Sequence, residues 1–462
     1  MTEPWTLSIA ELADRFRSGE TDPVAVVEAF RRRIADRDPV LNCYVAMNPT
    51  LDAEARRSAA RWRDGAPLSA LDGVPIAVKD NLVAAGMPAT WGSAAFAGDI
   101  RAADELPLAR LRAAGAIVLG KTNTPEFAVD GYTSNALFGT TRNALNPDLT
   151  PGGSSGGSAS AVAAGMAMAA LGTDGGGSIR RPAGYTGLYG LKPGIGAIPR
   201  SGGLPQVLLD FEVVGGLARS VADLRLLHDC LAGSDRRDPA SRTYPRVPAS
   251  AGLLRILHVP TLAGQPCDRA ILDASERAAE AMRRLGHLVQ TAEMPVDLAA
   301  LNAVWPRIAR IGLARMFDAA PQLAVRASPP YLEMAAEGHD LPAVQLWEIF
   351  DIVQELRRDV ARIFADWDVV MMPCAAARPW AAATPYPDTI DGRSVGPRGH
   401  AIYTGWVNAA GIPGLAIPVG PPVEGIPVGL QLIADIGQED LLLELAADYE
   451  RAAPLQPAGQ RG

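Results

Sequence analysis

Two serine-containing, glycine-rich turns are the part of this sequence best suited to chemistry. The first turn holds Ser154 and Ser155, and the second spans 175–178 with the sequence Gly-Gly-Gly-Ser. Glycine loses more backbone freedom on folding than any other residue, so such clusters indicate that the backbone comes close to something there. A serine hydroxyl beside several unused backbone N–H groups supplies a nucleophile and an oxyanion site. These are the two components of acyl transfer.

A serine nucleophile needs a base, and the histidines are poor candidates for it. The chain has five histidines, of which only His400 lies in a loop-like context. The pattern around Ser154 matches a nucleophile elbow, but the preceding segment 146–151 reads as a loop, whereas that motif needs a strand. Lys79 follows an apolar strand and can act as a base if burial lowers its pKa toward neutrality. A structural ion pair between Lys79 and an acid such as Asp80 is the alternative.

Nucleotide and metal sites are disfavoured. Residues 115–122 match the phosphate-loop pattern, yet the intervening residues read as an apolar strand. Pro125 also prevents a helix from starting directly after Thr122, as a phosphate loop requires. The histidines and acidic residues show no metal-ligand spacing. The sequence therefore predicts no metal and no cofactor.

Charge and hydropathy favour a protein without nucleic-acid or membrane partners. The chain has 43 Lys and Arg against 51 Asp and Glu, a net charge of −8 and an isoelectric point near 5.3. Nucleic-acid binding needs a basic surface, so this balance predicts none. The N-terminal segment lacks the features of a signal peptide, and the apolar run 159–171 is too short to span a bilayer. We therefore expect a cytoplasmic protein.

The elements that would position these serines and Lys79 alternate between strand and helix. A helical layer is predicted over about 1–65, beginning with a capping box at Ser8. Further on, the pattern predicts strands at 74–78, 116–119 and 166–171 and helices at 105–114 and 159–165. This order predicts an α/β fold with a mixed, largely parallel central sheet covered by helices on both faces. Ligands of such sheets bind beyond the carboxyl ends of the strands.

The second half of the chain is predicted to belong to the same domain. A polar loop over 234–250 is the best candidate boundary, and a mostly helical inserted segment follows over about 235–366. Strand patterns resume at 369–373, and two more strands are predicted near the C-terminus. We therefore expect a single domain over 1–462.

Over essentially its whole length the chain resembles the amidase-signature family of serine hydrolases. The segments that carry the resemblance are 71–81, 115–127, 146–178 and 179–183, with weaker matches at 190–193 and 408–413. Ser154 and Ser178 lie 24 positions apart, which matches the family pattern for the first loop serine and the nucleophile.

The resemblance implies a Ser–cis-Ser–Lys triad. Ser178 would be the nucleophile, Ser154 the bridging serine after a cis peptide bond, and Lys79 the ultimate base. The backbone N–H groups expected to hold the oxyanion are those of Gly175, Gly176, Gly177 and Ser178. The residues expected to support the loop, with a purely structural role as the alternative, are Ser155, Asp174 and Arg180. Gly175 stands where relatives often carry a larger residue.

The resemblance also implies a function. We expect an amidohydrolase that cleaves a small carboxamide to an acid and ammonia or an amine, with a homodimer as a family-level expectation. The alternatives are the glutaminase subunit of a tRNA-dependent amidotransferase, whose usual pattern differs from residues 125–139, and a non-catalytic binding protein on the same fold. The pocket is expected to lie between the 126–138 loop and residues 403–408, with Trp406 either in its wall or in the core.

Overall fold

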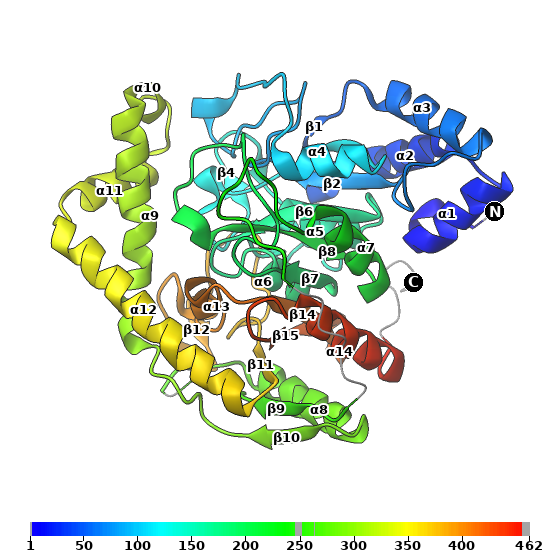
Figure 1. The fold of residues 1–462 in the computed structure, drawn as a ribbon. Helices are drawn as coiled ribbons and strands as arrows, with labels where there is room; N and C mark the ends of the chain where they lie inside the picture. The colour runs from blue at the N-terminus through cyan, green and yellow to red at the C-terminus, as the bar shows by residue number, and fades with distance from the viewer. Residues whose placement is uncertain (1, 245–251, 263, 455–462) are drawn as a thin grey trace.

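A mixed sheet forms the centre of the molecule. The computed structural model describes residues 2–244, 252–262 and 264–454, and within these ranges eleven strands join in one sheet (Figure 1). The strand order is β1-β3-β2-β6-β8-β7-β14-β15-β11-β9-β10. The strands are β1 (Tyr44–Met47), β2 (Pro75–Lys79), β3 (Ile117–Thr122), β6 (Ala169–Asp174), β7 (Tyr189–Lys192), β8 (Val213–Ala218), β9 (Arg255–His258), β10 (Leu288–Thr291), β11 (Val369–Pro373), β14 (Gly414–Val423) and β15 (Ile426–Ile433). Two short hairpins stand apart from it, β4 (Ser134–Asn135) with β5 (Gly139–Thr140) and β12 (Thr389–Ile390) with β13 (Arg393–Ser394).

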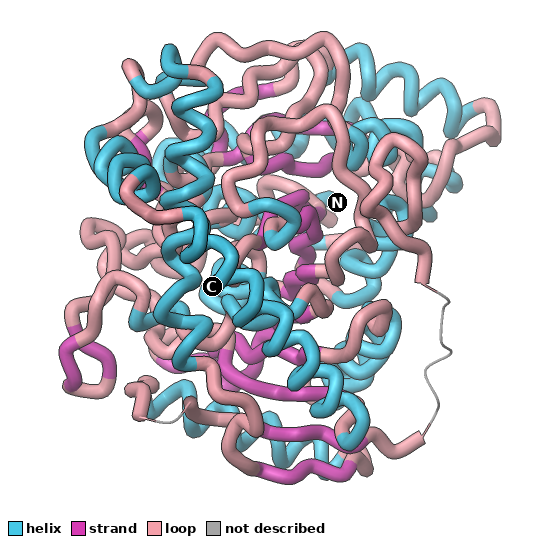
Figure 2. The backbone as a smooth tube through the Cα atoms, turned by 60° about the vertical axis from the view of Figure 1, so that its left-hand side comes forward, coloured by secondary structure: helices cyan, strands magenta, loops and turns pink. Residues whose placement is uncertain are grey.

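Both parallel and antiparallel pairs occur in this sheet, which confirms the predicted mixed α/β fold. Parallel pairing joins β3, β2 and β6 on one side and β11, β9 and β10 on the other. The strands between these groups pair antiparallel, as does β1 at the edge. The tube view shows the strands stacked through the middle, with helices outside them (Figure 2).

Helices cover the sheet along its whole length. They are α1 (Ile9–Ser18), α2 (Pro23–Leu41), α3 (Leu51–Arg63), α4 (Leu106–Ala113), α5 (Gly156–Ala163), α6 (Arg180–Thr186), α7 (Val221–Leu231), α8 (Arg269–Arg284), α9 (Ala299–Ala319), α10 (Pro321–Ala324), α11 (Pro329–His339), α12 (Ala343–Asp366), α13 (Gly405–Ala410) and α14 (Glu439–Ala452). None of the helices in the described part of the chain is both long and apolar enough to cross a membrane.

The first N-terminal helix begins where its capping residues predict it. The Ser8 hydroxyl accepts a hydrogen bond from the Glu11 N–H, and the Glu11 carboxylate accepts one from the Ser8 N–H, so the capping box is present. Helix α2 continues past Pro39, which lies inside the helix. It ends at Asn42, whose φ of 53° lies in the left-handed region.

The segment predicted as a mostly helical insertion contains two parts. Its first part, β9-α8-β10, adds two parallel strands to one edge of the central sheet. Its second part, α9–α12, lies on the side of the molecule opposite α1–α3 (Figure 1). The described part of the 234–250 loop carries no strand or helix, and residues 245–250 lie outside the described residues. The division of the chain into one domain with an insertion stays a prediction.

Candidate active site

The parallel pairing of β2 and β6 brings three sequence-predicted residues to one edge of the sheet. Lys79 is the last residue of β2, and the turn that contains Ser178 follows directly after β6. Ser154 lies two residues before α5, which packs on these two strands. Because the carboxyl ends of adjacent parallel strands meet at the same edge, chemistry can be assembled there from separated segments.

Lys79 is fully buried and bonded to hydroxyl groups. Its Nζ donates to Ser154 Oγ at 2.7 Å and to Thr173 Oγ1 at 2.8 Å. Burial lowers the pKa of Lys79 to about 7, although the charges of Glu212 and Asp174 oppose this shift. The sequence left open an ion pair between Lys79 and Asp80 as the alternative. In the structure Asp80 instead pairs with Lys121, whose Nζ lies 3.9 Å from Asp80 Oδ1.

The first serine turn is tied directly to the second. The peptide bond between Gly153 and Ser154 is cis. The Ser155 N–H donates to the carbonyl of Ser178 at 3.1 Å, and the Ser155 hydroxyl donates to the carbonyl of Thr173 at 3.1 Å. Ser155 therefore holds the two turns together through hydrogen bonds, which is the supporting role expected of it.

The backbone N–H groups of the second turn divide into two sets. Gly177, at a φ of 111°, donates its N–H to Asp174 Oδ1 at 2.6 Å. Within the described residues, the N–H groups of Gly175, Gly176 and Ser178 have no hydrogen-bond acceptor. The expectation that Gly177 also holds an oxyanion is therefore corrected, because its N–H is already used by the Asp174 carboxylate. The other three donors remain available.

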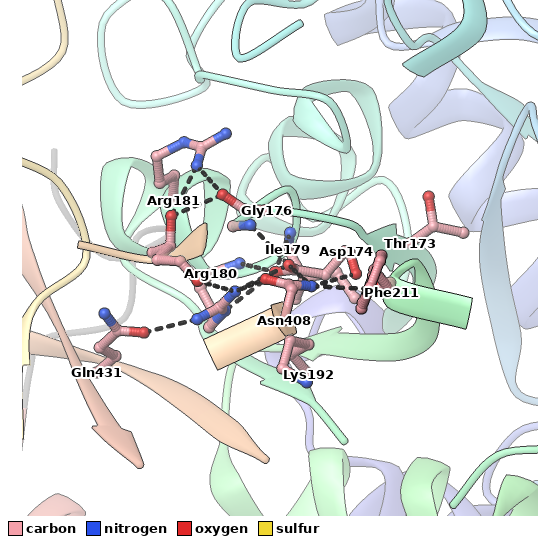
Figure 3. A network of polar contacts seen from close by, with 12 residues as sticks. Thr173, Asp174, Gly176, Ile179, Arg180, Arg181, Lys192, Phe211, Asn408 and Gln431 are labelled. Carbon is pink, nitrogen blue, oxygen red and sulfur yellow. Dashed lines mark hydrogen bonds and ion pairs between the residues drawn. The ribbon is translucent and has the colours of Figure 1, made fainter. Parts of the chain in front are cut away.

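A buried ion pair fixes the position of this turn. The Arg180 guanidinium donates to both carboxylate oxygens of Asp174, at 2.9 and 3.1 Å, and neither residue is exposed (Figure 3). Burial alone raises the pKa of Asp174, but the adjacent Arg180 charge and hydrogen bonds hold it well below its usual range. Ile179 also donates its N–H to Asp174, at 3.0 Å. Asp174 and Arg180 thus support the turn structurally.

Two residues near the C-terminus complete this network, and sequence reasoning predicted for neither of them a contact with Arg180. Arg180 donates to Asn408 Oδ1 at 2.6 Å and to Gln431 Oε1 at 2.8 Å (Figure 3). Asn408 in turn donates to the Asp174 carbonyl at 2.8 Å. The sequence pointed to Asn408 only as the end of the expected pocket segment 403–408 and the start of the weakly matching segment 408–413, and it gave no signal for Gln431.

Arg181 is a further residue of the site that the sequence did not single out. Its guanidinium donates to the Gly176 carbonyl, to Thr404 Oγ1 at 2.9 Å and to the Gly153 carbonyl at 3.3 Å. Burial lowers the pKa of Arg181 to about 10, so the group stays cationic at neutral pH. It therefore places a positive charge beside both serine turns.

A cavity of about 200 Å³ opens beside Ser178. The loop 128–131, the turn residues Gly175 and Gly176, and α9 line it, together with residues 397–401. The predicted contribution of the 126–138 loop is thus found, but residues 397–401 take the place expected for residues 403–408. Trp406 is 1% exposed and belongs to the core.

The described residues contain no cluster of three or more His, Cys, Asp or Glu side chains that could hold a metal ion. His258, one of the buried histidines, hydrogen-bonds to Thr291 and Ser275 instead of a catalytic serine. The arrangement at Ser178 therefore offers nucleophilic and hydrogen-bonding chemistry supplied by the chain itself.

Curated relatives match the chain end to end. The A-type subunit of glutamyl-tRNA(Gln) amidotransferase from Symbiobacterium thermophilum is 34% identical over 485 residues, covering 96% of each chain. The protein of the same name from Thermus thermophilus is 33% identical over 480 residues, again covering 96% of each. The prediction of a small-molecule amide as the partner, with no nucleic acid, is contradicted by these relatives, because their name is that of one component of an enzyme acting on a tRNA.

Solved structures with the same fold are amide hydrolases. A bacterial aryl acylamidase of the amidase-signature family superposes with a TM-score of 0.90 at 28% identity, covering 99% of each chain. A 6-aminohexanoate cyclic dimer hydrolase superposes with a TM-score of 0.86 at 28% identity, also covering 99% of each. The family model described as Amidase matches residues 25–443. The chain therefore belongs to the amidase-signature family and is an amidase.

Proposed function

We propose that this amidase hydrolyses its substrate through an acyl-enzyme on Ser178, with Ser154 as the proton relay and Lys79 as the base. The observation that carries the proposal is the contact of 2.7 Å between Lys79 Nζ and Ser154 Oγ, made by a lysine whose pKa burial lowers to about 7. A neutral amine accepts a proton, whereas an ammonium group does not. The arrangement thus supplies a base without a histidine.

In the first step, neutral Lys79 takes the proton of Ser154 as Ser154 takes that of Ser178. The Ser178 oxygen attacks the amide carbonyl, and the negative charge on the carbonyl oxygen is held by the N–H groups of Gly175, Gly176 and Ser178. Protonated Lys79 returns the proton through Ser154 to the leaving nitrogen as the carbon–nitrogen bond breaks. Water then hydrolyses the ester, which releases the acid and restores Ser178. These steps use no metal ion and no cofactor.

The names of the relatives favour the side-chain amide of glutamine as the substrate. In this proposal the chain is the A-type component of a glutamyl-tRNA(Gln) amidotransferase and releases ammonia from glutamine for transfer to the tRNA-bound glutamate. Relatives of that name match 96% of the chain at 34% and 33% identity. Since the name describes one component of a larger enzyme, another chain can supply the basic surface for the tRNA, which fits the net charge of −8 here.

A free-standing hydrolase of a small amide is the second candidate. The observation that favours it is the superposition on the aryl acylamidase over 99% of both chains. The cavity beside Ser178, at about 200 Å³, accommodates a small acyl group in either case.

Labelling and turnover test the common mechanism. A fluorophosphonate probe is expected to label the parent protein and not Ser178→Ala, while Ser18→Ala, at an exposed serine of α1, labels like the parent. Ammonia release from L-glutamine and from a panel of primary amides and anilides is then measured with and without candidate partner proteins. Glutaminase activity that depends on a partner supports the amidotransferase component, and efficient hydrolysis of other amides by the chain alone supports the free-standing enzyme. Folded protein that neither reacts with the probe nor hydrolyses any amide contradicts the proposal.

A further inference from the structure

Arg398 brings an unpaired positive charge to the cavity beside Ser178. Arg398 lines this cavity and is solvent-exposed, and its guanidinium makes no hydrogen bond or ion pair within 4.0 Å with the described residues. The surrounding protein lowers the pKa of Arg398 by desolvation, while the charge of Asp130 opposes this shift. Arginine stays protonated at neutral pH, so a guanidinium with five donors faces the cavity.

His400 adds a second polar group, a buried ring whose two nitrogens make no hydrogen bond to a described side chain. It lines the same cavity and is 3% exposed, and neither ring nitrogen makes a hydrogen bond of normal geometry with the described residues. Burial, together with the charges of Arg181 and Arg398, lowers the pKa of His400 well below its ordinary value. The ring is therefore neutral and keeps one N–H donor and one acceptor nitrogen. Buried polar groups are nearly always hydrogen-bonded, so this ring is suited to a bound molecule.

The charges around the cavity favour an anion. Arg181 and Arg398 are both cations, and Arg310 is paired with Glu337 at 2.8 Å. Asp130 is the carboxylate in the wall, and it accepts a hydrogen bond from the Tyr331 hydroxyl at 2.7 Å. The wall thus contains two guanidinium groups that are not paired with a carboxylate, those of Arg181 and Arg398, and one carboxylate, that of Asp130. The cavity therefore has an excess of positive charge.

We propose that the cavity selects amides whose acyl part carries a carboxylate, with Arg398 pairing with that carboxylate and His400 donating a second hydrogen bond. The inference rests on the proposed function, because it assumes that the amide carbonyl lies at Ser178. A planar guanidinium matches the two oxygens of a carboxylate. The cavity of about 200 Å³ limits the acyl part to a short chain. Glutamine has such a carboxylate, and so does glutaramate, which is glutamine without its amino group.

Glutaramate and pentanamide provide a matched pair of test compounds, since they share a five-carbon chain and differ in the terminal carboxylate. The parent enzyme is expected to show a higher kcat/KM for glutaramate. Arg398→Leu is expected to lower the ratio of the two kcat/KM values by about fivefold or more, because a solvent-exposed charge pair contributes less to binding than a fully desolvated one. Arg398→Lys should keep part of the selectivity. Arg362→Leu, at a side chain that is 78% exposed on α12, is the control and should leave the ratio unchanged.

A second readout does not depend on turnover. Glutaramate is expected to protect Ser178 from the fluorophosphonate probe at lower concentration than pentanamide does, and Arg398→Leu and His400→Phe should each remove this difference. Thermal unfolding identifies any variant that fails to fold, in which case Arg398→Lys and His400→Gln are used. The inference is overturned if the two amides protect the parent equally, or if the difference between their protecting concentrations is unchanged in folded Arg398 variants. In both cases labelling of Ser178 still supports the proposed function. Absence of labelling in folded parent protein contradicts the proposed function itself.

Discussion

Replacing Lys79 with methionine is expected to change how the stability of the protein depends on pH. Methionine fills a similar volume without a charge. Burial lowers the pKa of Lys79 from 10.5 to about 7 in the folded protein. The folded pKa lies below the unfolded one, so between these values the unfolded chain binds more protons and stability rises with pH. Below pH 7 the Lys79 side chain carries its proton in both the folded and the unfolded protein, so its full destabilising effect is present.

The magnitude follows from the size of this shift. A difference of one pKa unit corresponds to about 1.4 kcal/mol, so burial of Lys79 destabilises the fold by about 5 kcal/mol at acidic pH. At pH 9 the remaining gap to the unfolded pKa corresponds to about 2 kcal/mol. The parent protein should therefore gain about 3 kcal/mol of unfolding free energy from this group alone between pH 6 and pH 9. The variant lacks this gain.

Denaturant unfolding at pH 6, 7, 8 and 9 measures the effect as the difference between parent and variant. Other titrating groups contribute to both proteins and cancel in this difference. Lys192 offers a matched control, since burial also lowers its pKa to about 7, and Lys192→Met should remove a similar gain. The hydroxyls of Ser154 and Thr173 lose a donor in Lys79→Met, but that loss does not vary with pH.

A difference between parent and Lys79→Met that stays constant from pH 6 to pH 9 would refute the reasoning. It would mean that Lys79 is protonated in the folded protein throughout this range. The group would then be a structural cation, and the proposed base would be lost.

Three further predictions concern the same site. The kcat/KM of the parent should rise about tenfold per pH unit below pH 7 and level off above it, because only neutral Lys79 accepts a proton; a flat profile from pH 5 to pH 9 would exclude this base. Asp174→Asn should lower the unfolding free energy by about 3–5 kcal/mol, since it leaves Arg180 buried without a countercharge, and an effect below 1 kcal/mol in chemical denaturation would contradict that role. Dialysis against EDTA should leave the rate of amide hydrolysis unchanged, and recovery only on adding a metal ion would contradict the proposed steps.

Local patterns were enough to predict the elements that carry the proposed triad. The capping box at Ser8 and the apolar strand before Lys79 each depend on a few adjacent residues, and both are found. The strand predicted at 166–171 lies instead at 169–174, because the apolar run begins before the backbone enters the sheet. This offset matters for the site, since it makes Asp174 the last residue of the strand and starts the turn directly after its carboxylate.

Contacts between distant segments could not be predicted. Asn408 and Gln431 reach Arg180 across 228 and 251 residues, and no local pattern specifies such a pairing. The use of the Gly177 N–H by Asp174 depends on the exact path of the turn. The cavity wall at 397–401 comes from a loop that ends in the short 3₁₀ helix Gly399–Ala401, and sequence periodicity carries little information over so short a segment.

The network around Arg180 also bears on when this site can be completed as the chain is synthesised. Lys79, Ser154 and Ser178 all lie in the first 178 residues, but the groups that hold Arg180 include Asn408 and Gln431. A growing chain on the ribosome therefore contains Ser178, the proposed nucleophile, long before it has the residues that fix the turn of Ser178. We therefore expect chains truncated before Asn408 to be inactive even though they contain the proposed triad, because Arg180 would lack its contacts with Asn408 and Gln431.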